Sequence, residues 1–383
     1  MNETAPVSRI RAIDVLRGAI MVLMAIDHVR VYSGQPAGGP EPGIFFTRWV
    51  THFCAPGFVF LAGTSAFFYG LKLKNKAKLA GYLITRGVLL VLLELTLIRF
   101  AWTFNFNYSE FVLAGVIWML GWCMIIMAAF IWLRPWIVGI AGLAIIVGQQ
   151  AFAHVPKLLP AVEQTSFGRF WEFIYPSGFE PVQGVTVLYV LVPWIGVMAA
   201  GYGFGLILLQ EPQKRNRLCR LIGLLAILLF IIIGSIIILR QPSAPDEQPF
   251  VFQLLNQRKY PASFLYILMT LGPLIALIPF AEKVRGWFAN VFTTFGRVPF
   301  FYYLLHIPLI HVSALAVNFI RDGNMHQELY VTAPYTWMPP EHQWNLLLLY
   351  LVFMIDVVIL YFVCRRYEKH KFSHPESKWM KYI

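Results

Sequence analysis

Three ionisable residues near the start of the chain, Asp14, Arg17 and His28, have the spacing to act together. At about 100° per residue in an α-helix, Asp14 and Arg17 project within about 60° of each other. His28 lies within about 40° of Asp14 after four turns, so the three residues share one helical face. A carboxylate and a guanidinium at one end, with an imidazole at the other, could hold a charged substrate and move a proton.

His28 is the candidate general base on this face and lies about 21 Å from Asp14 along the helix. A neutral imidazole accepts a proton from an attacking hydroxyl or amine, and a nearby carboxylate such as Asp27 can set its tautomer. Adjacent helical residues point about 100° apart, so Asp27 need not be the direct partner. His52 opens the second apolar segment at the depth predicted for His28, and we expect it in the same site. A packing or interfacial role stays open for both histidines.

Further ionisable residues fall in later apolar segments. Glu94, eight residues after Arg86, is predicted near the middle of the membrane and needs a cationic or hydroxyl partner. Tyr302 and His306 are one helical turn apart on the same face, and Arg297 precedes them. We predict that these residues, together with Asp14 and Arg17 of the first segment, line a polar passage. Pairing that only fixes helix packing is the alternative.

The elements that must position these residues are transmembrane helices. Only 13% of the 383 residues are charged and 58% are hydrophobic, whereas soluble domains are about 25% charged. A membrane helix needs ~20 mostly apolar residues. We therefore predict an all-α, polytopic membrane helix bundle of about ten transmembrane helices, at 13–32, 52–71, 80–100, 111–133, 135–153, 186–209, 218–239, 261–280, 298–319 and 344–364.

Lysine and arginine are unevenly distributed among the predicted loops. If the N-terminus is cytoplasmic, 22 of the 31 lysine and arginine residues lie in or beside the segments on the cytoplasmic side. The N-terminal segment 1–12 and the tail 365–383 are therefore both predicted in the cytoplasm, as parts of one domain, 1–383, in the plasma or inner membrane. The net charge of +12 indicates loops that face anionic lipid, with no nucleic acid as partner. Because charged residues interrupt the first apolar run, we do not expect a cleaved signal peptide.

Several classes of protein find no support in the sequence. The four cysteines have neither metal-ligand spacing nor a disulfide framework, so we predict packing roles for them and no metal. Motifs of nucleotide-binding P-loops, dinucleotide-binding folds, zinc proteases and serine hydrolases are absent from the sequence. An ATPase, a metalloprotease or a serine hydrolase is not expected.

The segments 11–18 and 24–28 resemble the opening of the heparan-α-glucosaminide N-acetyltransferase-like membrane family. They are also similar to the acyltransferase-3 family, whose first helix begins with Asp-x-x-Arg and ends in a His at the spacing found here. The segments 52–65 and 296–306 fit as well. The resemblance is strong over the first 70 residues and elsewhere depends mainly on the number of helices.

The resemblance implies that an acetyl group is transferred from cytoplasmic acetyl-CoA to a sugar or glycan on the outer side. It implies a catalytic role for His28 and places Asp14 and Arg17 near the point where acyl-CoA enters. Arg86 and Arg297 carry further guanidinium groups that suit phosphates. We expect direct attack on the thioester; an acylated His28 and a homodimer are options that the sequence leaves open.

A transporter or permease is the main alternative, in which the same polar stripe forms a path for a substrate or for protons. The sequence shows no inverted repeat and no paired broken helices, which disfavours this alternative. A non-catalytic membrane sensor or scaffold is a third interpretation. It differs from the enzyme because His28 would then be replaceable without loss of activity.

Overall fold

The computed structural model describes the parts of the chain at 10–109, 111–180, 184–241, 248–332, 337–374 and 376–377. The ends of the two predicted cytoplasmic segments, 1–9 and 378–383, lie outside the described residues. The chain divides into two compact units, and each is described by itself. The terminal unit comprises Arg11–Cys54, Leu97–Asn107 and Phe280–Ile383, and the central unit consists mainly of Ala55–Thr96 and Tyr108–Pro279.

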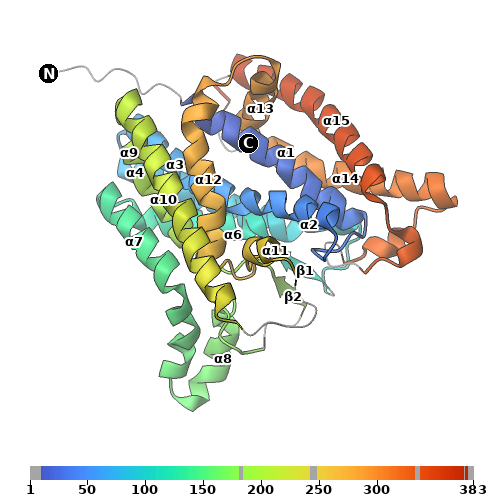
Figure 1. The fold of residues 1–383 in the computed structure, drawn as a ribbon, viewed down its shortest axis with the longest axis horizontal. Coiled ribbons are helices and arrows are strands. Elements are labelled where there is room, and N and C mark those ends of the chain that lie inside the picture. The colour runs from blue at the N-terminus through green and yellow to red at the C-terminus, as the bar shows by residue number, and fades with distance from the viewer. Residues whose placement is uncertain are drawn as a thin grey trace. The chain divides into compact units, whose positions relative to one another are not determined.

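The terminal unit is built around its first helix. Helix α1 packs against α13, α14, α15 and the 3-10 turn at Val50–Phe53 (Figure 1). Two further 3-10 turns, at Gln327–Tyr330 and Pro340–His342, lie in the connection from α14 to α15. The helices of this unit are α1 (Arg11–Tyr32), α2 (Pro42–Trp49), α5 (Arg99–Thr103), α13 (Trp287–Arg297), α14 (Pro299–Asp322) and α15 (Leu346–Ser373).

Glycines bring α1 and α13 into backbone contact. A methyl group added at Gly18 would overlap the carbonyl of Phe292, and one added at Gly296 would overlap the carbonyl of Asp14. Small residues at a crossing let two helix backbones approach closely, which is how membrane helices gain packing energy. The close contact fixes the charged first turns of α1 against the end of α13.

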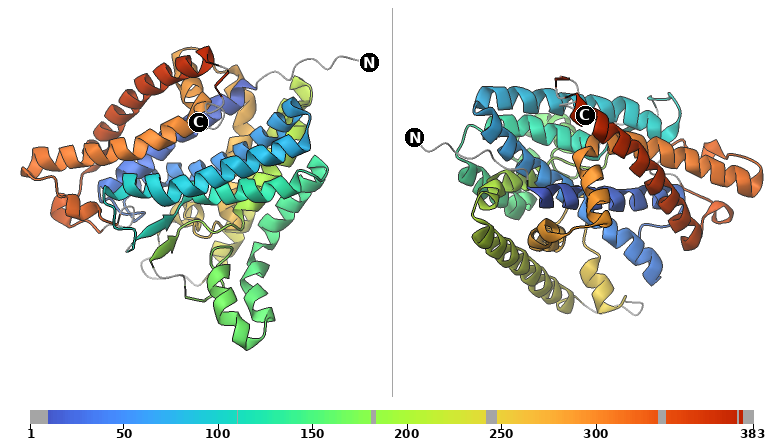
Figure 2. Two further views of the ribbon diagram at one scale, coloured as in Figure 1. Left: turned by 180° about the vertical axis from the view of Figure 1, so that it is seen from behind. Right: turned by 90° about the horizontal axis from the view of Figure 1, so that it is seen from above.

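The central unit is also helical, with α4 against α6 and α7 against α9 (Figure 2). Glycines again face each other at these crossings, as at Gly87 and Gly121. A π-helical turn at Glu94–Ile98 follows α4, and 3-10 turns at Gln149–Leu158 follow α7. The helices are α3 (Cys54–Leu73), α4 (Lys76–Leu93), α6 (Val116–Phe130), α7 (Pro135–Gly148), α8 (Ala161–Trp171), α9 (Trp194–Leu208), α10 (Pro212–Leu239), α11 (Phe250–Leu255) and α12 (Phe264–Lys283).

Each of the ten predicted spans contains a helix of the structure. Seven helical segments among the described residues are long and apolar enough to cross a membrane. The other three predicted spans correspond to α1, which carries several charged residues, and to α6 and α9, which have 15 residues each. A helical membrane protein is therefore confirmed, while the number of about ten crossings and the cytoplasmic ends stay predictions.

Two helix starts differ from prediction because short strands precede them. Strand β1 (Val112–Ala114) pairs in parallel with β2 (Val185–Val187), where helix was expected from 111 and from 186. The β-branched residues of β2 favour a strand. Helix α6 begins only after Gly115, and α9 begins only after Pro193.

Candidate functional site

Two histidines from different helices meet in the terminal unit. Nδ1 of His28 on α1 lies 2.7 Å from Nε2 of His306 on α14. The sequence predicted both residues as site residues, but it did not predict that they would be partners. His306 is completely buried, whereas His28 is partly exposed. The pair therefore joins a buried ring to one that a ligand can approach.

The hydrogen bonds around His306 determine where the protons of a neutral pair lie. Nδ1 of His306 is 2.7 Å from the carbonyl oxygen of Tyr303, and because a carbonyl only accepts, this nitrogen carries the proton. Nε2 of His306 is then an acceptor, so Nδ1 of His28 donates to it. In this arrangement Nε2 of His28 bears the lone pair and is the basic nitrogen of the pair.

Aromatic rings surround the histidine pair. Trp102 contacts the ring of His28 edge-on with 4.9 Å between the ring centroids, and Tyr302 stacks on His306 at 5.5 Å. The side chain of Tyr302 is fully buried, and its hydroxyl has no hydrogen-bond partner among the described residues. A buried hydroxyl without a partner is costly, which makes Tyr302 a candidate polar group of the site.

Asp27 pairs with Arg30, its neighbour one turn later on α1, at 3.1 Å between Oδ1 and Nη2. His52 is buried on the 3-10 turn that packs against α1, and its Nδ1 donates to the carbonyl of Arg48 at 3.1 Å. Catalytic roles for Asp27 and His52 stay predictions.

Asp14 and Arg17 form the predicted pair at the other end of α1. Their charged atoms are 3.8 Å apart, and Nη1 of Arg17 also donates to the carbonyl of Gly296 at 3.2 Å. Gly296 lies in the last turn of α13, where unpaired carbonyls attract a cation. The pair therefore supports the packing of α1 on α13, which is the alternative role that the sequence left open.

A cavity of about 380 Å³ opens beside this end of α1. Arg297 lines the cavity and pairs with Glu368 of α15 at 2.7 Å, while Thr294 donates to the second oxygen of Glu368. Arg11, the first residue of α1, supplies a second guanidinium. The remaining lining residues are Asn290 and Thr293. Two guanidinium groups outnumber the single carboxylate in this cavity, and guanidinium groups suit a phosphate.

Arg86 and Glu94 belong to the central unit and are described there. Arg86 donates from Nη1 to the hydroxyl of Tyr82 at 2.7 Å. Oε2 of the buried Glu94 accepts from the backbone amides of Ile117 and Trp118 at 3.0 and 3.3 Å. Among the described residues, the partners of Glu94 are thus backbone amides at the start of α6 rather than the expected cation or hydroxyl, because a helix N-terminus offers amides and a positive dipole end. A place for either residue in a passage stays a prediction.

Two acidic residues of α15 were not among the predicted site residues. Asp356 is fully buried and accepts from Ser313 at 2.7 Å, and Glu368 faces the cavity. Asp356 stands alone in an apolar run, and a carboxylate within a membrane helix is by itself a signal of function. Glu368 carried no such signal, because it lies among basic residues at the end of α15.

The chain was also compared with known proteins. The family model described as heparan-alpha-glucosaminide N-acetyltransferase, catalytic, matches residues 9–242. Comparison with curated proteins gave no match. The matched segment includes His28 and His52, whereas His306 and the cavity residue Arg297 come after it.

Proposed function

Because the chain belongs to the heparan-alpha-glucosaminide N-acetyltransferase catalytic family, we propose that it transfers an acetyl group from cytoplasmic acyl-CoA to a sugar or glycan on the outer side of the membrane. The family establishes a membrane transferase. The donor, the acceptor and the direction of transfer are the parts we propose. The observation that carries the proposal is the hydrogen-bonded pair of His28 and His306.

In the proposed reaction, Nε2 of His28 removes the proton from the hydroxyl or amine of the acceptor. The acceptor atom attacks the thioester carbonyl, the new C–O or C–N bond forms, and the C–S bond breaks. The proton on His28 then passes to the departing thiolate. His306 stabilises the transient imidazolium, because its Nε2 accepts from Nδ1 of His28 while its own Nδ1–H is held by Tyr303. A base oriented by a second group follows the logic of catalytic triads.

The cavity beside α1 is the proposed site for the phosphates of the donor. Arg11 and Arg297 supply guanidinium groups there, and Asn290 adds a side-chain amide. Along α1, Arg11 lies about 25 Å from His28. An elongated donor such as acyl-CoA, with its phosphates and its thioester at opposite ends, suits such a separation.

The test uses the purified full chain in proteoliposomes with radiolabelled acetyl-CoA and a panel of sugars and lipid-linked glycans. Wild type should transfer label to an acceptor, and His28→Ala should slow transfer by about 10²–10⁴-fold, the usual contribution of a general base. His154→Ala is the matched control, because His154 is an exposed histidine of the central unit. The control should retain wild-type transfer.

The outcomes separate an enzyme from a transporter. If wild type moves an unmodified solute across the membrane and neither transfers label nor cleaves the thioester, the polar stripe is a transport path and the proposal is wrong. If label is transferred equally by wild type and His28→Ala, the chain is an acetyltransferase whose base lies elsewhere.

A further inference from the structure

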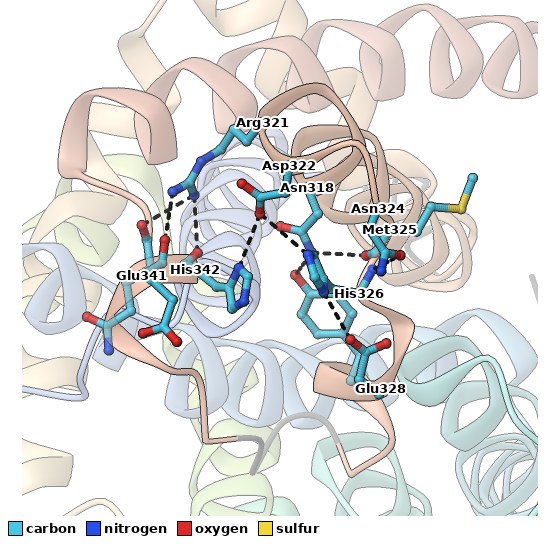
Figure 3. Close-up of polar contacts among 11 residues, drawn as sticks. Asn318, Arg321, Asp322, Asn324, Met325, His326, Glu328, Glu341 and His342 are labelled. Carbon is cyan, nitrogen blue, oxygen red and sulfur yellow. Dashed lines mark hydrogen bonds and ion pairs between the residues drawn. The ribbon is translucent and has the colours of Figure 1, made fainter.

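A group of metal-ligating side chains lies in the connection between α14 and α15, away from the histidine pair on the helices. Asp322 ends α14, His326 follows on the next turn, and His342 ends the 3-10 turn Pro340–His342 (Figure 3). One ligand atom from each of the three residues lies within 4.8 Å of the other two. We refer to Asp322, His326 and His342 as the Asp-His-His cluster.

The separations in the cluster fit a small divalent transition metal. Oδ2 of Asp322 is 3.2 Å from Nδ1 of His342 and 3.6 Å from Nε2 of His326. Zinc binds imidazole nitrogen and carboxylate oxygen at about 2.0–2.2 Å in tetrahedral geometry, which places neighbouring ligand atoms about 3.3 Å apart. The ligand atoms of the two histidines lie within 4.8 Å of each other. The cluster therefore offers three of the four ligands of a zinc site.

A fourth residue orients one of the ligands. Nδ1 of His326 donates to Oε1 of Glu328 at 3.0 Å, which leaves Nε2 of the same ring directed at Asp322 (Figure 3). Histidines that bind metals usually donate their other ring N–H to a carboxylate or a carbonyl, which fixes the tautomer and raises the basicity of the ligand. The contact between His326 and Glu328 has this arrangement.

The backbone around the cluster is also held in place. Arg321 donates to the carbonyls of Glu341, His342 and Gln343 at 3.0–3.3 Å, and so attaches the turn that carries His342 to the end of α14. His326 itself adopts a left-handed conformation with φ of 52°. Its backbone N–H donates to Oδ1 of Asn324 at 3.2 Å. These contacts position the ligands before any ion arrives, which favours binding.

We propose that Asp322, His326 and His342 bind one zinc ion, or a related divalent transition metal, with Glu328 as the outer carboxylate. The ion would connect the end of α14 to the turn before α15. The ligand side chains are 18–30% exposed, so a water molecule would take the fourth position. The site goes beyond the proposed acetyl transfer and does not depend on it. The spacing of the cysteines gave no reason to expect it, because the ligands are histidine and aspartate.

The experiment measures zinc binding to the purified full chain, produced without a polyhistidine tag and freed of metal with a chelator. Zinc chloride is titrated against a competing fluorescent chelator, and X-ray absorption then identifies the ligands. Wild type should bind one zinc ion per chain through two imidazoles. His326→Ala and His342→Ala should each lower the affinity by at least 100-fold, and Glu328→Gln by about 10–100-fold.

Two controls make the result decisive. His154→Ala should bind zinc as wild type does. His370→Ala tests another close histidine pair, His370 and His374, whose rings lie 4.3 Å apart at the end of α15. The proposal is wrong if wild type binds no zinc, or if His370→Ala removes the binding that the cluster variants retain. In that case the Asp-His-His cluster is only a set of ion pairs. If the metal-free protein retains acetyl transfer, the zinc site is not required for that reaction.

Discussion

At the scale of single residues, the central question is what His306 adds to His28. His306→Phe keeps an aromatic ring beside Tyr302 but removes the acceptor for Nδ1–H of His28. We expect kcat to fall by about 10-fold or more, since a hydrogen bond to a charged group such as the imidazolium of His28 contributes roughly 1.5–3 kcal/mol, with little change in KM for acetyl-CoA. His306→Gln should restore part of kcat, because an amide oxygen can accept the same hydrogen bond. Equal loss in both variants, or a rise in KM alone, would contradict a positioning role.

The sequence indicated candidate site residues but not which of them would be partners. Helical periodicity placed Asp14, Arg17 and His28 on one face, and the ion pair of the first two is local enough to follow from spacing. The contact of His28 with His306 joins residues 278 positions apart, so it depends on which helices pack together. The same reason explains why the amides that cap Glu94 could not be foreseen.

At the scale of helices, the contact of α1 with α13 should be sensitive to one added carbon. Gly18→Ala places a methyl group against the carbonyl of Phe292 and should destabilise the protein by about 1–3 kcal/mol or more, as overpacking does. Gly81→Ala in α4 is the matched control, because nothing lies within 4 Å of the added carbon. The control should be neutral or slightly stabilising, since alanine favours a helix by about 1 kcal/mol. Thermal unfolding in detergent compares the two, and equal melting temperatures would contradict the tight crossing.

The long helices were predictable and the short ones were not. Prolines mark several starts: Pro299 opens α14, and Val298 before it is non-helical, as residues before proline usually are. Helix α13 was missed because its 11 residues include the polar positions Asn290, Thr293 and Thr294, which a search for apolar runs passes over. This amphipathic helix provides much of the lining of the cavity.

At the scale of the whole molecule, the charge distribution predicts which parts of the chain face the cytoplasm. If α14 and α15 both cross the membrane, the connection between them faces outward and the tail faces inward. The four natural cysteines are buried, so single cysteines introduced at exposed positions can report the two sides. We expect Thr332→Cys to react with a membrane-impermeant maleimide on intact cells. Ser373→Cys should react only after permeabilisation.

The outcome of this labelling bears on both proposed sites. If position 332 faces outward, the nearby Asp-His-His cluster is exposed to metal outside the cytoplasm. If position 373 faces inward, the cavity at Arg297 and Glu368 lies on the side that supplies acyl-CoA. Unmodified wild-type protein should stay unlabelled before and after permeabilisation, which controls for the natural cysteines. If Ser373→Cys reacts on intact cells and Thr332→Cys does not, the predicted orientation is reversed. The direction of acetyl transfer would then have to be reversed as well.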